Sequence, residues 1–182
     1  MKLNEYVELK YPDALNAIRE SKSAREVTEL TEHEKAIIYA YSDEGYEVNA
    51  ELRKFRELVT PEFAVHLNAA LAKLPSTNAV VHRGIWRIDS VLEMYQDAFK
   101  TDAVLTEYGF TSASKSRGIA EQFGEIILDI ASKNGKAIEK LTKFGASAMD
   151  NEQEVLFRSS SKFIVRNIVE RNSFIYISLK EI

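Results

Sequence analysis

The chain has 182 residues, of which 45% are hydrophobic and 29% charged, values typical of one globular domain with a sizeable core. Its formal net charge of −4 gives no general attraction to nucleic acid or anionic membranes, so we expect neither as a partner. Cysteine is absent, which excludes disulfides, thiolate metal sites and thiol catalysis. The sequence has no apolar leader after Met1 and no run of about 18 apolar residues, so we expect neither a signal peptide nor a membrane span.

The first 75 residues predict a helical layer. Apolar residues recur there at helical spacing. They are Ile37, Ile38, Tyr41, Leu52, Phe55, Leu58 and Val59. The Thr31-Glu32-His33-Glu34 sequence predicts a capping box, in which Thr31 caps a helix and Glu34 reaches back to the backbone of Thr31. Pro61 predicts the first turn of a further helix, which ends before Pro75.

After residue 75 the pattern changes to short strands. The predicted strands are 79–82, 110–114 and 126–130. Residues 161–170 and 173–182 predict a final hairpin that turns at Arg171 and Asn172. Helices followed by strands indicate an α+β fold. Because no linker or repeat interrupts the chain, we expect a single domain over 1–182, with a helical layer over 1–75 and a β-rich core over 76–182.

Residues 151–157 predict a strand that carries two carboxylates two positions apart. Residues i and i+2 of a strand point to the same face, so Glu152 and Glu154 are expected side by side. Adjacent carboxylates repel each other, and one reason to keep them together is chemistry on a cationic target or a cationic transition state. Taken alone, a Glu-x-Glu pair before a strand is more often a solvated edge.

Several familiar site patterns are missing from the sequence. There is no glycine-rich dinucleotide fingerprint and no P-loop, and Ser112 does not lie in a nucleophile elbow. His33, His66 and His82 do not have the spacing of metal ligands, so we expect no metal site. The residues that remain are Arg83 at a strand end, the Ser112-Ala113-Ser114 strand, and the two glutamates.

The order and spacing of these three elements resemble the R-S-E class of mono-ADP-ribosyltransferases, which includes iota-type toxin catalytic domains and small phage enzymes. Further segments between residues 34 and 170 are similar to patterns of that family. They are 39–53, 81–85, 109–114, 120–123 and 147–157, followed by Lys162-Phe163. Two positions depart from the family pattern: Ala113 replaces a threonine, and one residue is missing before Asn49.

The resemblance implies N-terminal helices packed on a two-sheet β core, with NAD in a cleft between the sheets. It also implies that NAD is a co-substrate, that nicotinamide is released, and that ADP-ribose passes to an accessible arginine of a target protein without a metal. Two alternatives stay open: an NAD glycohydrolase with water as acceptor, and a catalytically silent domain of the same fold that binds a partner.

The resemblance assigns roles to the central residues. Arg83, followed by Gly84, would bind the NAD phosphates, since a guanidinium group suits phosphate oxygens bidentately. Glu154 would stabilise the ribosyl cation that forms when nicotinamide leaves, as carboxylates do in glycoside chemistry. Ser112 would orient Glu154 by a hydrogen bond. Glu152 would bind and deprotonate the acceptor arginine, whose guanidinium group is otherwise cationic and a poor nucleophile.

The same resemblance places further residues around NAD and the target protein. Phe123 would stack on the nicotinamide, and Tyr41, Tyr46 and Asn49 would line the cleft, although ordinary packing would equally explain all four. Met149 occupies a position at which the family often has an aromatic residue that meets the target. We expect a monomer that acts in the cytoplasm of the producing cell or of a target host cell.

Overall fold

The computed structural model describes residues 1–56, 58–146 and 151–182. The N-terminal part is helical, as predicted. Its helices are α1 (Leu3–Lys10), α2 (Pro12–Glu20), α3 (Lys22–Arg25), α4 (Glu32–Phe55) and α5 (Glu62–Lys73). The capping box at the start of α4 is confirmed: the Glu34 N–H donates to Thr31 Oγ1 at 3.3 Å, and the Thr31 N–H donates to Glu34 Oε2 at 2.9 Å. Pro61 is the residue before α5 rather than part of its first turn.

The remaining elements alternate between strands and short helices. The first of them are β1 (Val80–Ile85), α6 (Asp89–Thr101), β2 (Val104–Glu107), β3 (Thr111–Ser114), α7 (Arg117–Ala120) and the 3-10 turn η1 (Glu121–Phe123). The chain ends with β4 (Ile126–Ala131), β5 (Lys136–Ala137), β6 (Glu154–Phe157), β7 (Ser161–Arg171) and β8 (Phe174–Glu181). Within the described ranges, none of the helices has both the length and the hydropathy that a bilayer crossing requires.

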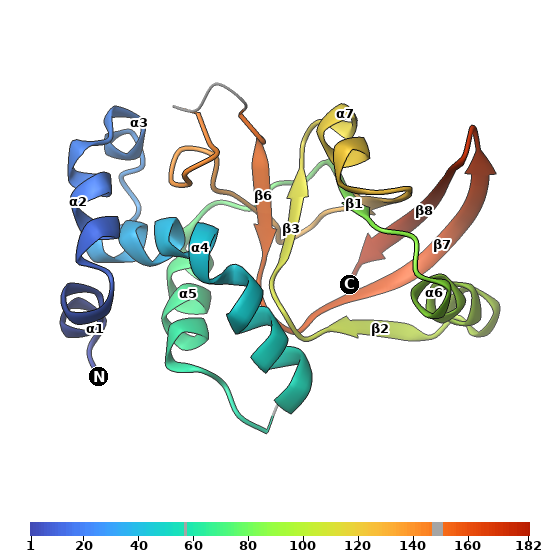
Figure 1. The fold of residues 1–182 in the computed structure, drawn as a ribbon, viewed down its shortest axis with the longest axis horizontal. Coiled ribbons are helices and arrows are strands. Elements are labelled where there is room, and N and C mark those ends of the chain that lie inside the picture. Colours follow the sequence, from blue (N-terminus) through green and yellow to red (C-terminus); the bar gives the residue numbers. More distant parts are fainter. Residues whose placement is uncertain (57, 147–150) are drawn as a thin grey trace.

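The α+β prediction is confirmed, but the strands of the described residues form one sheet where two were predicted. Its order is β2-β7-β8-β4-β1-β3-β6-β5, and the pairing of β4 with β8 is parallel. The register between β1 and β3 consists of one residue pair, His82 with Ser114. The sheet therefore splits at this point into a half with β3, β6 and β5 and a half with β1, β4, β8, β7 and β2 (Figure 1).

Two hydrophobic cores lie on opposite sides of β6. Leu156 points into the core formed by the N-terminal helices, whereas Val155 and Phe157 point into the core formed by α6, β1, β4, β7 and β8. This alternation follows from the strand period of two, and it explains why β6 is an uninterrupted apolar run after Glu154. In Figure 1, α4 and α5 lie on the β6 side of the sheet and α6 lies by β2 and β7.

Candidate active site

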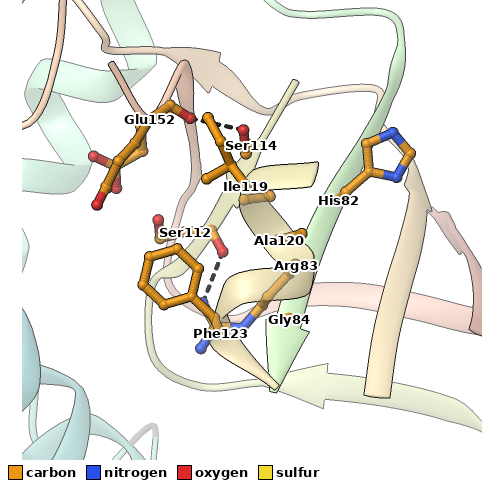
Figure 2. A pocket seen from close by; sticks show the side chains of 11 residues that line it. His82, Arg83, Gly84, Ser112, Ser114, Ile119, Ala120, Phe123 and Glu152 are labelled. Carbon is orange, nitrogen blue, oxygen red and sulfur yellow. Dashed lines mark hydrogen bonds between the residues drawn. The ribbon is translucent and has the colours of Figure 1, made fainter. Parts of the chain in front are cut away.

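A cavity of about 260 Å³ opens where the two halves of the sheet separate. Its walls come from β1, β3, the α7–η1 segment, and the chain at the start of β6 (Figure 2). The lining residues are His82, Arg83, Gly84, Ser112, Ala113, Ser114, Ile119, Ala120, Phe123, Glu152 and Glu154. The cavity thus brings together the arginine, the serine and both glutamates that the sequence singled out.

Arg83 is held in the cavity by the neighbouring strand. Its Nη1 donates to the backbone carbonyl of Ser112 at 2.7 Å, which joins β1 to β3 beyond their single ladder pair. The next residue, Gly84, has no room for a side chain, because a Cβ there would lie 1.9 Å from the carbonyl oxygen of Ala120. Gly84 therefore lets the α7 backbone pack directly on β1 beside Arg83.

Glu154 is the most deeply placed charge-bearing group of the cavity, with a fractional exposure of 8%. Burial raises the pKa of its carboxyl group from 4.5 to about 7; a hydrogen bond from Ser112 and the charge of Arg83 oppose this rise, while the charge of Glu152 adds to it. Ser112 and Glu154 lie on paired strands, β3 and β6, in which Ser114 is the direct partner of Glu154. Ser112 thus acts on the pKa of Glu154 from the neighbouring strand, and its role in orienting Glu154 stays a prediction.

The Glu152 side chain lines the same cavity, but Glu152 precedes the strand on which it was predicted to lie. The strand begins only at Glu154, because Gln153 adopts a left-handed backbone with φ of 49°. The Asn151 side chain stabilises this turn by accepting from the Gln153 N–H at 2.8 Å. The prediction that strand alternation places the two glutamates side by side is therefore wrong in its reason, although both carboxylates line the cavity. Burial also raises the pKa of Glu152.

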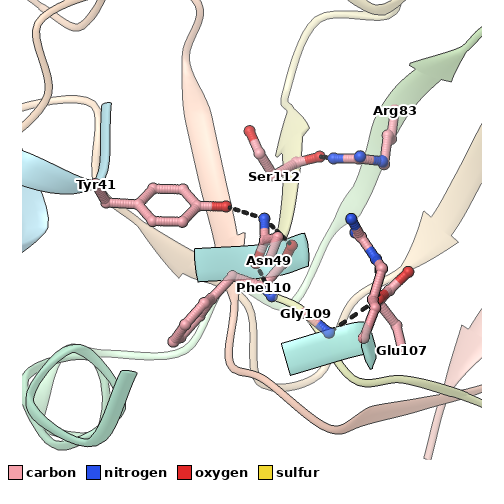
Figure 3. A network of polar contacts seen from close by, with 8 residues as sticks. Tyr41, Asn49, Arg83, Glu107, Gly109, Phe110 and Ser112 are labelled. Atoms are coloured by element: carbon pink, nitrogen blue, oxygen red, sulfur yellow. Dashed lines mark hydrogen bonds and ion pairs between the residues drawn. The ribbon is translucent and has the colours of Figure 1, made fainter. Parts of the chain in front are cut away.

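Three residues of α4 were predicted to line the NAD cleft. Tyr41 and Asn49 belong to a hydrogen-bond network, whereas the Tyr46 side chain lies at the surface. The Asn49 side-chain amide donates to Tyr41 Oη at 3.0 Å and to the Phe110 carbonyl at 3.2 Å, and its oxygen accepts from the Phe110 N–H at 2.7 Å (Figure 3). Burial raises the pKa of Tyr41 to about 12, so its hydroxyl stays protonated. Tyr46 is 87% exposed. None of these three residues lines the cavity, and their contact with NAD stays a prediction.

Phe123 and Met149 complete the predicted set. Phe123 is half exposed at the end of η1 and lines the cavity together with Ser112 (Figure 2). Met149 lies outside the described residues.

The described part of the chain holds no cluster of three or more histidine and carboxylate side chains suited to a metal ion. Independence from metals therefore stays a prediction.

Sequence reasoning missed a second cavity and several residues of the first. The second cavity, of about 380 Å³, lies between α6 and the sheet and meets the first at Arg83. Arg53 of α4 and Glu107 at the end of β2 line this second cavity and form an ion pair of 2.9 Å. His82 and Ser114 were not predicted as cavity residues, because they become neighbours only through the pairing of β1 with β3. The spacing of Asn49 and Arg53, one helical turn apart, was the available signal for Arg53.

Comparison with known proteins agrees with this geometry. The model of the ADP-ribosyltransferase exoenzyme family matches residues 4–179. The chain is 29% identical over 167 residues to NAD(+)–protein-arginine ADP-ribosyltransferase Tre1 of Serratia proteamaculans, an alignment that covers 90% of this chain but 35% of that protein. The chain thus spans about a third of the length of that curated relative.

Solved structures of low sequence identity share the fold. ADP-ribosyltransferase HopU1 of Pseudomonas syringae superposes with a TM-score of 0.80 at 20% identity, covering 94% of this chain and 87% of that one. Exoenzyme S of Pseudomonas aeruginosa gives a TM-score of 0.75 at 18% identity, covering 98% and 86%. Because the family model matches nearly the whole of its length, the chain belongs to the ADP-ribosyltransferase exoenzyme family.

Proposed function

We propose that this chain transfers ADP-ribose from NAD to the side chain of an arginine in a target protein. One observation carries the proposal: a buried glutamate, Glu154, shares a cavity with Arg83, Ser112 and a second glutamate, Glu152. Two carboxylates and one guanidinium suit a substrate that develops positive charge next to a phosphate group. The Serratia relative is named as an arginine ADP-ribosyltransferase, which supports the same acceptor here.

The two cavities fit the two halves of a dinucleotide. They meet at Arg83, whose guanidinium group would bind the central pyrophosphate. The cavity with Glu154 would then hold the nicotinamide and its ribose, and the larger cavity with Arg53 would hold the adenosine. Exoenzyme S, which shares the fold, was crystallised with carba-NAD, and this supports NAD as the ligand.

The residues then divide the chemical work. The bond between the nicotinamide nitrogen and the ribose carbon breaks, its electron pair leaves with neutral nicotinamide, and ionised Glu154 stabilises the ribosyl cation left behind. Ser112 would orient Glu154 by a hydrogen bond, and its lowering effect on the pKa of Glu154 supports this role. A nitrogen of the acceptor guanidinium forms the new bond to the ribose carbon, and Glu152 takes the proton that this nitrogen releases.

The partner and the place of action follow from this chemistry. The partner is a protein with an accessible arginine, and an acidic enzyme with a net charge of −4 favours a basic surface around it. We propose that the reaction takes place in the cytoplasm of the producing cell or of a target host cell, where NAD and target proteins occur together.

The first test is incubation with labelled NAD and with separate bacterial and eukaryotic lysates, beside a Glu154→Gln variant. A labelled protein band that disappears in the variant is the expected result. Release of nicotinamide without protein labelling, with agmatine also failing as an acceptor, would instead identify a glycohydrolase. No NAD consumption under any condition would favour the catalytically silent binding domain.

A second test addresses the acceptor. Glu152→Gln should abolish labelling of protein and of agmatine while leaving slow nicotinamide release to water, because only the acceptor step needs the second carboxylate. Arginine modification at the wild-type rate in this variant would show that the assignment of Glu152 is wrong.

A further inference from the structure

The α7–η1 segment, residues 117–123, covers the candidate active site and is called the arm below. Ile119, Ala120 and Phe123 of the arm line the cavity. Yet η1 buries none of its residues, and Phe123 is half exposed. Ala120 is buried where the arm packs on Gly84, but little apolar burial holds the outer end of the arm, so polar contacts are needed to fix it.

Asp129 of β4 provides such a contact. Its Oδ2 accepts from Arg117 Nη2 at 3.0 Å, and its Oδ1 lies 2.7 Å from His82 Nδ1. The Asp129 side chain is 17% exposed, so these bonds are less weakened by solvent than those of a surface pair. One carboxylate thus joins the first residue of the arm to the strand that carries Arg83.

Two further contacts locate the ends of the arm. Tyr176 of β8 donates from its hydroxyl to Glu121 Oε1 at 3.3 Å, and its ring lies under the Arg117 guanidinium group at 5.5 Å. At the beginning of the arm, Ser114 Oγ accepts from the Ser116 N–H at 3.0 Å and donates to the Glu152 carbonyl at 2.7 Å. The arm is therefore tied to the backbone of the candidate acceptor glutamate on one side and to Asp129 on the other.

We propose that Asp129 is a positioning residue for NAD: by holding Arg117 and His82 together it fixes the arm, and with it Phe123, over the cavity. The inference rests on the proposed function for its ligand. A fixed arm is already in place when NAD binds, whereas a loosened arm has to be ordered at that moment, which weakens binding without changing the bond-breaking step. Asp129 itself does not line the cavity.

The kinetic test uses Asp129→Asn with NAD and agmatine as substrates. The variant keeps the side-chain shape but removes the charge that pairs with Arg117, and the expected result is a KM for NAD raised about 5- to 20-fold. The kcat value and the KM for agmatine should stay within about twofold of the wild type. Arg117→Gln should behave alike, and the double variant should be no worse than either single variant, because both remove one interaction.

Asp97→Asn is the matched control. Asp97 lies on α6 and forms an exposed ion pair with Lys100, at 3.5 Å, so its loss should leave both KM values unchanged. A KM for NAD that is unchanged in Asp129→Asn, or additive losses in the double variant, would overturn the proposal.

Hydrogen exchange of the arm gives a readout that needs no activity. In Asp129→Asn, amides of residues 116–124 should exchange faster, while those of β6 should keep their wild-type protection. Exchange of the arm at the wild-type rate would contradict the proposal.

If the wild type itself consumes no NAD, the proposed function fails and this exchange measurement still decides whether Asp129 fixes the arm. Should Asp129→Asn lose its circular dichroism signal, Arg117→Gln, whose side chain is about half exposed, decides instead.

Discussion

At the scale of single residues, Glu154 combines two opposed requirements. In its proposed role it has to be ionised to stabilise a cation, yet its burial favours the protonated form and raises its pKa to about 7. Arg83 and Ser112 only partly offset this effect. The carboxylate is thus held in a state of high energy, in which a positive charge that develops beside it is strongly attracted.

The first prediction concerns pH. Between about pH 5.5 and 9, kcat/KM for NAD should rise with pH, reach half its maximum near pH 7 and level off above about pH 8, because the protonated fraction of Glu154 is inactive. The measurement is the rate of nicotinamide release at low substrate concentration, with Glu154→Gln as the control, for which the profile should be flat and low. A wild-type rate that is constant across this range would contradict the assignment.

The second prediction concerns the destabilising effect of the Glu154 carboxylate on the folded state. Its folded pKa of about 7 exceeds the ordinary value of 4.5, so between these values the native state binds more protons than the unfolded state, and stability falls as pH rises. Glu154→Gln removes this loss. The variant should therefore melt a few degrees above the wild type at about pH 8, and the difference should vanish near pH 4.5, as measured by thermal unfolding. A variant that melts below the wild type at alkaline pH would refute this account.

Residue types and spacing were sufficient to predict four central residues of the candidate site, but neither its geometry nor several of its other lining residues. Arg83, Ser112 and the two glutamates fall in one cavity. The left-handed conformation of Gln153, however, depends on the Asn151 side chain and on the Glu152 N–H, which donates to the Phe144 carbonyl at 2.9 Å. This second bond comes from a loop that is distant from any strand pattern, so local alternation could not reveal it.

At the scale of elements, the contact between α4 and β3 shapes the floor of the site. Asn49 satisfies both the N–H and the carbonyl of Phe110, one residue before β3 begins at Thr111. The ring of Phe110 in turn packs edge-on against Tyr41 at 5.6 Å. A single amide on the long helix therefore sets where the strand that carries Ser112 starts.

The third prediction tests this contact. Asn49→Ala leaves the partly buried backbone groups of Phe110 without their partner, which should cost about 2 to 4 kcal/mol of unfolding free energy. Denaturant unfolding measures the loss. Glu47→Ala, an exposed position on the same helix, is the control and should change stability by no more than about 0.5 kcal/mol. A loss in Asn49→Ala no larger than that of the control would show that the contact does not support β3.

Elements with strong local signals were predictable, and elements that depend on their neighbours were not. The capping box at Thr31 and the alternation of β8 each follow from a few adjacent residues. Helix α6 was missed although Leu92 and Tyr95 have helical spacing, so its local signal was present and was not used. Strand β2 is short, and it is defined by its pairing with β7.

At the scale of the whole molecule, β6 is the element shared by the two cores. Leu156 belongs to one core and Phe157 to the other, so neither core can lose β6 without exposing apolar surface of the other. We propose on this basis that residues 1–182 fold as one cooperative unit, in agreement with the single domain expected from the sequence.

The fourth prediction follows from this shared strand. Unfolding in denaturant should give the same midpoint by far-ultraviolet circular dichroism, which is dominated by the helices, and by the fluorescence of Trp86, which follows β1. Leu156→Ala should lower both midpoints together. Two separate midpoints in the wild type would indicate that the two cores unfold independently.

The overall arrangement was predicted less fully than the site. The order of helices and strands indicated an α+β fold, but the single pair between His82 and Ser114 that both joins and separates the sheet halves could not be read from the sequence. Strand order depends on long-range pairing, and the parallel neighbours β4 and β8 are separated in the chain by β5, β6 and β7.

The place of β8 in the sheet has a consequence for biosynthesis. Although it follows the other strands in the chain, it lies between β7 and β4, and β4 in turn supports the strand that carries Arg83. A ribosome releases this segment only after the cavity residues have all left the exit tunnel, so the nascent chain cannot complete its sheet earlier. If the proposed function holds, the strand that carries Arg83 therefore gains its full support only after β8 has left the ribosome.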